Sequence, residues 1–307
     1  MISALSGFAV IAVIVLIGWT AGRWAHLPPS TVPVIGRLAY VVLSPCLLFT
    51  SASASDPRVL FSEPLLVSAL AACTCFALHA LITRRHSVDA GSGPRIIGAL
   101  AAGYNNAGNI GIPIAAYVLH DPALAVPIVI LQLLVITPIA LTLLELATTG
   151  HNSWRTSLTA PLRSPLTVSV LLGVVVAVTG LHLPSVITTP IDAIGQSAVP
   201  VVLIAFGMSL SGGRVLAPGP DRLPTLAAVV LKVALMPAVA YLLAQALHLS
   251  PTETYAVTVL AALPAAQNVF LYAQTFNTAV TLARDAVFLS TLLCVPILLT
   301  IAVVAAP

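Results

Sequence analysis

Residues 103 to 113 read Gly-Tyr-Asn-Asn-Ala-Gly-Asn-Ile-Gly-Ile-Pro and lie in the middle of a long apolar segment. Glycine and proline weaken a helix, and asparagine side chains compete for backbone hydrogen bonds, so this stretch predicts a broken helix. We expect Gly108, Gly111 and Pro113 to form the break, with Pro113 near the start of a new half-helix, where its missing N–H is tolerated. Within a bilayer, irregular backbone is found only where it is buried in protein or lines a cavity.

The composition around this stretch is that of a polytopic membrane protein. Of 307 residues, 59% are hydrophobic and 7% are Asp, Glu, Lys or Arg, with a mean hydropathy of +1.08. A soluble domain carries about 25% charged residues, so the chain cannot cover a surface exposed to water. This excludes a soluble enzyme. The net charge of +3 is spread over short connectors, which excludes a nucleic-acid partner and leaves the lipid bilayer as the surroundings.

The cysteines give no sign of a metal site or of a cofactor. Cys46, Cys73, Cys75 and Cys294 all lie inside apolar runs, and their spacing is not that of metal ligands. We therefore interpret them as small buried apolar residues.

Apolar segments long enough to cross the membrane recur along the whole chain. A helix needs about 20 apolar residues to span the hydrocarbon, and this criterion predicts ten spans in an all-α fold. Their expected limits are 4–24, 32–53, 64–83, 96–119, 123–147, 166–183, 190–211, 223–247, 253–276 and 284–304. Several spans should be kinked or broken, because seven of the 24 prolines lie well inside them: Pro45, Pro113, Pro138, Pro200, Pro237, Pro264 and Pro296.

The distribution of positive charge predicts the orientation. Nine arginines lie in the connectors after the odd-numbered spans, whereas Arg58 is the one arginine in the even-numbered connectors. Since Lys and Arg mark the cytoplasmic side, both termini should face away from the cytoplasm. We expect an integral protein of a bacterial-type inner membrane.

The two halves of the chain resemble each other at an offset of about 155–159 residues. His26-Leu27-Pro28 matches His182-Leu183-Pro184, Pro45 matches Pro200, and Asn109 matches Asn268, while residues 138–142 match residues 296–300. This predicts a first five-helix repeat over residues 1–147, a short cytoplasmic connector over 148–165 and a second repeat over 166–307. Because each repeat has an odd number of spans, the second enters the membrane inverted, an arrangement typical of secondary transporters.

The predicted ninth span carries a second polar interruption, Leu263-Pro264-Ala265-Ala266-Gln267-Asn268, at a depth that matches the first. If both helices break there, two half-helix N-termini face the bilayer centre and form an anion site without a cationic side chain. Amide groups can add hydrogen bonds to a carboxylate; the candidates are Asn105, Asn106, Asn109, Gln267 and Asn268. The alternative is that these amides only join neighbouring helices, as polar residues in bundles often do.

These motifs resemble the auxin efflux carrier family, which includes plant auxin exporters and bacterial carriers of small dicarboxylates such as malonate or malate. The similarity covers both halves of the chain. It rests on Ile35-Gly36-Arg37 with Pro45-Cys46-Leu47-Leu48-Phe49, on residues 106–113, on Leu131-Gln132 followed by Glu145, and on Ala262-Leu263-Pro264. Residues 164–166, Pro200 and residues 206–210 fit the same pattern.

The resemblance implies how the fold would work. Helices four and nine would cross at their breaks, helices 1, 2, 6 and 7 would form a scaffold, and helices 3–5 and 8–10 a moving transport domain. A homodimer joined through the scaffold is expected. At the matching positions, Asn106 would contact the substrate carboxylate, Gln132 would line the pocket, and Leu48 or Phe49 would form the scaffold wall. The long cytoplasmic loop of many plant members is absent.

Three ionisable residues of the predicted spans are candidates for coupling transport to an ion: Lys232, His79 and Glu145. The alternatives are that the Lys232 side chain extends to the cytoplasmic edge and that Glu145, at the end of the fifth span, is interfacial. Lys232 lies deep in the eighth span, where a charge is costly. Helices four and nine hold no Asp or Glu between residues 95 and 120 or between 255 and 281. Because sodium sites prefer oxygen ligands with a carboxylate, this disfavours sodium coupling and leaves proton coupling or uniport open.

The sequence thus predicts a secondary transporter that moves a small organic anion by elevator-type alternating access. The substrate would be a mono- or dicarboxylate, auxin-like acids included. The alternatives are an anion channel and a sodium-coupled organic-anion symporter like the bile-acid carriers. No Gly-x-Ser-x-Gly or His-Glu-x-x-His motif and no paired intramembrane carboxylates are present, which argues against an enzyme.

Overall fold

The computed structural model describes residues 2–54, 63–84, 91–111, 114–115, 118–119, 122–149, 165–211 and 214–304. All regular elements within these ranges are helical, and the one isolated extended pairing joins Asn105 and Ala265. Pro113 and residues 150–164 of the predicted connector lie outside the described residues.

The elements of the first half follow the predicted spans closely. They are α1 (Ile2–Trp24), α2 (Thr31–Leu38), η1 (Ala39–Leu43), α3 (Ser44–Ser53), α4 (Glu63–Ile82), α5 (Ser92–Gly103), η3 (Ala107–Gly111), η4 (Pro122–Ala125), α7 (Val126–Leu131), η5 (Gln132–Ile136) and α8 (Thr137–Thr149). Here η4 is a 3₁₀ turn, and the other η elements are π-helical.

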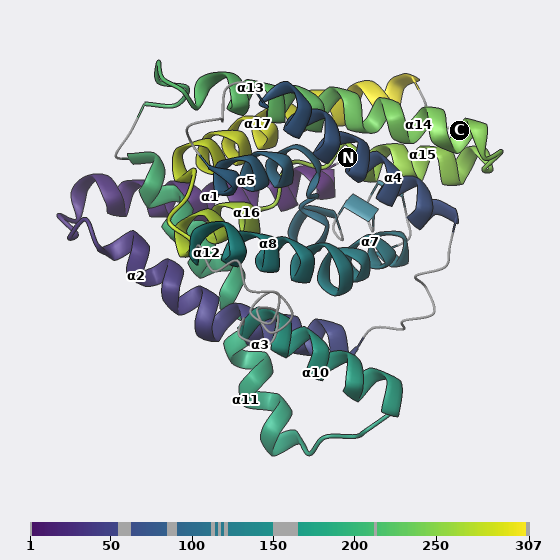
Figure 1. The fold of residues 1–307 in the computed structure, drawn as a ribbon. Coiled ribbons are helices and arrows are strands. Elements are labelled where there is room, and N and C mark those ends of the chain that lie inside the picture. The colour runs from purple at the N-terminus through teal and green to yellow at the C-terminus, as the bar shows by residue number, and fades with distance from the viewer. Residues whose placement is uncertain are drawn as a thin grey trace.

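The second half repeats this pattern after the connector. Its elements are α10 (Pro165–Thr179), α11 (Ser185–Gln196), α12 (Ala198–Ser211), α13 (Arg222–Val230), the π-helical η6 (Leu231–Leu235), α14 (Met236–Ala246), α15 (Pro251–Ala261), α16 (Gln267–Thr275) and α17 (Val280–Val304). Figure 1 shows these helices gathered in one bundle, with α10 and α11 projecting from one side beside α3.

Five helical runs in the described residues are long and apolar enough to cross a membrane: Thr31–Ser53, Glu63–Ile82, Ser185–Ser211, Arg222–Ala246 and Val280–Val303. Each coincides with a predicted span. The expected all-helical class is therefore confirmed for the described residues, whereas the number of ten spans stays a prediction.

Proline shapes three helices of the bundle in the same way. The π-helical turns η1, η5 and η6 each end two residues before a proline, namely Pro45, Pro138 and Pro237. Proline lacks an N–H, and its ring clashes with the carbonyl four residues earlier, so a wider turn at this point relieves the clash. By contrast, α17 continues through Pro296 without interruption.

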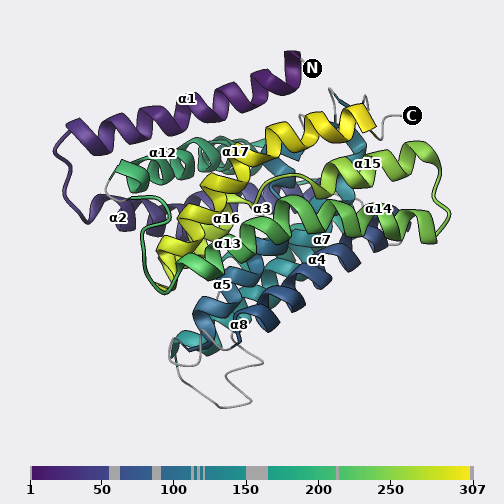
Figure 2. The same cartoon turned by 90° about the horizontal axis from the view of Figure 1, so that it is seen from above.

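The two halves also pack alike. Helix α1 lies along α12, and α10 lies along α3, so the first helix of each half packs against the second helix of the other. Figure 2 shows α1 running beside α12. Glycine permits both contacts, because a Cβ on Gly207 would meet the backbone of Val15, and a Cβ on Gly173 would come within 2.7 Å of the Phe49 carbonyl oxygen.

A buried ion pair connects the start of α17 to neighbouring segments. Arg284 Nε donates to Asp285 Oδ1 at 2.7 Å near the start of α17, and Asp285 Oδ2 accepts the Leu216 N–H at 2.9 Å. Arg284 also donates to the Ser209 carbonyl at 3.3 Å, which ties α17 to the end of α12. Partial burial and the nearby Asp285 carboxylate raise the pKa of Asp221, which precedes α13.

Candidate functional site

Two helix interruptions meet at the centre of the bundle. Helix α5 ends at Gly103 and α15 ends at Ala261, and in both cases a few non-helical residues follow before the next helical turn. The Asn106 N–H donates to the Pro264 carbonyl at 2.9 Å, and the Ala266 N–H donates to the Tyr104 carbonyl at 3.1 Å. Each interrupted segment thus provides hydrogen-bond partners for backbone groups of the other, and buried irregular backbone requires such partners.

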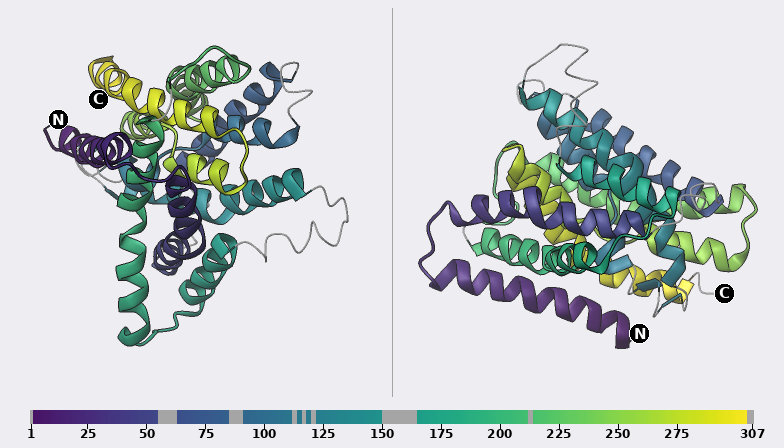
Figure 3. Two further views of the ribbon diagram at one scale, coloured as in Figure 1. Left: turned by 90° about the vertical axis from the view of Figure 1, so that its left-hand side faces the viewer. Right: turned by 90° about the horizontal axis from the view of Figure 1, so that it is seen from below.

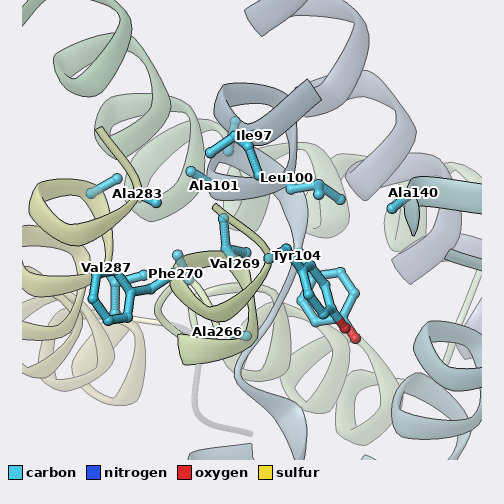
Figure 4. Close-up of a cluster of buried hydrophobic side chains, with 14 of the residues drawn as sticks. Ile97, Leu100, Ala101, Tyr104, Ala140, Ala266, Val269, Phe270, Ala283 and Val287 are labelled. Atoms are coloured by element: carbon cyan, nitrogen blue, oxygen red, sulfur yellow. The ribbon is translucent and has the colours of Figure 1, made fainter. Parts of the chain in front are cut away.

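Side chains from two further helices hold the same segments. Gln132 Nε2 donates to the Asn105 carbonyl at 2.9 Å, and the Ala265 N–H donates to Ser290 Oγ at 3.1 Å. The Tyr104 hydroxyl lies 2.9 Å from Thr137 Oγ1. Figure 4 shows Tyr104 packed beside Val269 of α16 in the apolar cluster that surrounds the interruptions.

A cavity of about 230 Å³ lies beside the two interruptions. One wall is polar and comes from residues 104–108, Gln132 and residues 266–268. The other wall is mainly apolar and comes from α3 and the start of α12. Its residues are Ser44, Leu47, Leu48, Ser51, Ala198, Val199 and Val202, and Val129 and Leu133 complete the lining.

The structure brings most of the predicted site residues together at this cavity. Its lining includes six of the predicted binding residues and the predicted break residue Gly108: Leu48, Asn105, Asn106, Gly108, Gln132, Gln267 and Asn268. Pro264 takes part in the backbone pairing and Gly111 ends η3, but neither they nor Phe49 of α3 line the cavity. The backbone of Asn109 belongs to η3, while its side chain lies outside the described residues.

Two residues that line the cavity have side-chain atoms whose hydrogen-bonding capacity the described residues do not use. Asn106 Nδ2 and Asn105 Oδ1 are buried without a hydrogen-bond partner in the described part of the chain, and their residues are 2% and 3% exposed. Helix α16 begins at Gln267, and its N-cap, Ala266, has no side chain that could cap it. An amide donor beside a helix N-terminus suits an anion, because both supply N–H groups and positive potential.

The candidate coupling residues lie away from this lining. Lys232 is fully buried in η6, where its Nζ donates to the Ala261 carbonyl at 2.8 Å and contacts Met236 Sδ at 3.2 Å. His79 is fully buried in α4, with Nε2 3.1 Å from the Pro224 carbonyl. Glu145 is half-buried on α8.

Sequence reasoning did not single out three kinds of residue that the structure places at the site. Tyr104 lies within the quoted stretch and lines the cavity. Ser44 and Ser51 share a face of α3 with Leu48, a pattern that the helical period could have revealed. Ser290 holds the second interruption, and the repeat offset could have found it, because it stands 158 positions after Gln132.

Comparison with known families finds the same repeat. A family model described as membrane transport protein matches the chain twice, over residues 4–154 and over residues 151–302. The two matches together cover almost the whole chain and meet within the predicted connector. No curated protein matches the chain.

Proposed function

Since the chain belongs to the membrane transport protein family, the family of the auxin efflux carriers, we propose that it is a secondary transporter for a small organic carboxylate. The observation that carries this proposal is the amide of Asn106, a cavity residue whose Nδ2 has no partner in the described chain, together with the start of α16 in the same lining. No charged side chain lines the cavity among the described residues, so binding would be weak enough for release.

The size of the cavity favours an acid of a few carbon atoms. Pockets for drug-sized ligands enclose about 300–1,000 Å³, and this cavity of about 230 Å³ is smaller. The apolar wall from α3 and α12 would contact the hydrocarbon part, while the amide wall would bind the carboxylate. A small mono- or dicarboxylate therefore fits better than an acid with a bicyclic ring.

The proposed architecture has ten spans in two inverted repeats, with the fourth and ninth crossing at their interruptions. The equivalent packing of α1 on α12 and of α10 on α3 supports this, because two similar halves produce paired contacts. Figure 3 shows the start of α1 and the end of α17 at the same end of the bundle, as an even number of crossings requires.

A second cavity supports movement between two access states. It encloses about 500 Å³ between α1, α12, α16 and α17, and Gln267 lines both cavities. Its residues Leu203 and Phe206 stand 155 positions after Leu48 and Ser51 of the first cavity. Similarly, Val287 and Thr291 stand 158 positions after Val129 and Leu133, so equivalent helix faces of the two repeats line the two cavities.

We assign the two cavities to opposite sides of the membrane. In this proposal, the helices that carry the interruptions slide against a scaffold of α1, α2, α3, α10, α11 and α12, opening one cavity as the other closes. The scaffold would also form the contact between the two subunits of a homodimer.

Uptake by purified protein in proteoliposomes tests the function, with radiolabelled malonate, malate and indole-3-acetate as probes. We expect saturable uptake of at least one small acid, and its loss in Asn106→Ala. Gln245→Ala, which removes an exposed amide from α14, should transport like the wild type. Normal uptake by Asn106→Ala would refute the site, and large single-channel currents would indicate an anion channel instead.

A further inference from the structure

Lys232 occupies an unusual position for a charged side chain. It is fully buried in η6, and it is hydrogen-bonded to a backbone carbonyl and a thioether instead of a carboxylate. The other buried Lys, Arg, Asp or Glu side chains in the described ranges are Arg284 and Asp285, which neutralise each other at 2.7 Å. An ammonium in this setting is therefore a net positive charge in the core, which is costly without a nearby anion.

The ammonium lies at the C-terminus of α15, the half-helix that precedes the second interruption. Its acceptor, the Ala261 carbonyl, belongs to the last residue of α15, where the helix dipole is negative and favours a cation. Six residues later the chain re-enters a helix at Gln267, and the first turn of this helix lines the cavity. Lys232 thus contacts the residue after which the second interruption begins, and an anion in the cavity would lie near the residues at which the interruption ends.

The titratable groups that face Lys232 in the described chain are thiols, and no carboxylate is among them. Cys75 of α4 and Cys294 of α17 face it, and both thiols are buried. Of the other described elements packed against η6, α13 and α5 carry Arg222 and Arg95 close to their N-termini, and α14 carries the exposed Tyr241. Helix α4 also carries the buried His79. A carboxylate bound in the cavity, at the other end of the second interruption, would supply a negative charge.

We propose that Lys232 carries the coupling proton of a proton–carboxylate symport. In the empty carrier its amine is neutral and still donates to the Ala261 carbonyl. When a carboxylate enters the cavity, Lys232 takes up one proton, so that the ammonium balances one negative charge of the substrate. In both forms the moving helices cross the membrane without an uncompensated lysine charge, and release of the carboxylate releases the proton on the same side.

This inference rests on the proposed function, and equilibrium measurements separate the two. Malonate serves as the probe, in proteoliposomes held at zero membrane potential with potassium and valinomycin. With one proton per malonate, a tenfold proton gradient between pH 7 and pH 8 should support about a tenfold malonate gradient in the wild type. Leu242→Ala, an exposed change on α14, should behave in the same way.

Variants at Lys232 should lose the coupling. In Lys232→Met the proton gradient should leave malonate equally distributed, although malonate still exchanges across the membrane. Lys232→Arg keeps a permanent positive charge and should also lose the response, because arginine does not release its proton. A purely structural role for the charge predicts the opposite result for Lys232→Arg, namely a normal response to the proton gradient.

The outcomes are distinct. Saturable malonate uptake that ignores the proton gradient in the wild type would overturn the inference and leave the transporter function intact. A proton-driven gradient that persists in Lys232→Met or Lys232→Arg would overturn the role of Lys232. Absence of saturable flux for malonate, malate and indole-3-acetate would instead overturn the proposed function.

A binding measurement removes the dependence on folded variants. Malonate added to wild-type protein in weakly buffered solution at pH 8 should remove about one proton per binding site from the medium, detected with a pH-sensitive dye. Binding without proton uptake, seen as a rise in thermal stability with no change in dye signal, would refute the proposal.

Discussion

Gln132 and Ser290 stand 158 positions apart in the sequence, and each hydrogen-bonds to the backbone of one helix interruption. Gln132 binds the Asn105 carbonyl at 2.9 Å, and Ser290 accepts the Ala265 N–H at 3.1 Å. Pro138 and Pro296 in the same two helices have the same offset. Equivalent positions of the two repeats therefore hold the two interruptions, although the side chains and the bonded backbone groups differ.

Removing either of these two hydrogen bonds should destabilise the protein. Gln132→Leu leaves the buried Asn105 carbonyl without this donor, and Ser290→Ala leaves the Ala265 N–H without its acceptor. An unsatisfied buried polar group costs about 1–3 kcal/mol, so each variant should unfold at a lower temperature in detergent. The measurement is thermal unfolding monitored by intrinsic fluorescence.

Thr300→Val is the matched control for Gln132→Leu and Ser290→Ala. Thr300 is exposed on α17, and its hydroxyl donates to the Pro296 carbonyl within the same helix, so its loss should change the unfolding temperature little. If Gln132→Leu and Ser290→Ala unfold at the temperature of this control, the two hydrogen bonds do not stabilise the interruptions.

The charge of the cavity wall should decide whether an anion binds. Asn106→Asp replaces the amide whose Nδ2 has no partner in the described chain with an acidic group of nearly the same size. At neutral pH the new carboxylate should repel a bound carboxylate, so the stabilisation of the protein by malonate in a thermal-shift assay should disappear. Retained stabilisation by malonate would place the anion away from Asn106.

Hydropathy, proline positions and the repeat predicted much of this arrangement from the sequence. The interruption around Asn106 was predictable because glycine, proline and asparagine all disfavour a continuous helix there. The π-helical turn before Pro237 was not, because the position of a proline does not determine how the preceding turn relieves the clash. The hydrogen-bond partner of Lys232 was also not predictable from the sequence, because a bond to the Ala261 carbonyl depends on where α15 ends in space.

The close approach of α1 and α12 should depend on glycine. A Cβ at position 207 would overlap the Val15 carbonyl and would lie 2.9 Å from the Trp19 nitrogen, so Gly207→Val must push the helices apart. Overpacking of this kind typically costs about 1–3 kcal/mol, and we expect a lower unfolding temperature in detergent. Gly219→Ala, where a Cβ meets nothing within 4 Å, is the control and should unfold like the wild type.

His79 provides a contrast with Lys232, because both are ionisable and fully buried in neighbouring helices. The ring of His79 packs against Gly98 of α5, and its Nε2 lies 3.1 Å from the Pro224 carbonyl of α13. These contacts join three helices, which indicates a structural role. We expect His79→Gln to lower the unfolding temperature while malonate uptake keeps its dependence on the proton gradient. If His79→Gln folds stably but malonate uptake no longer responds to the proton gradient, His79 and not Lys232 carries the coupling proton.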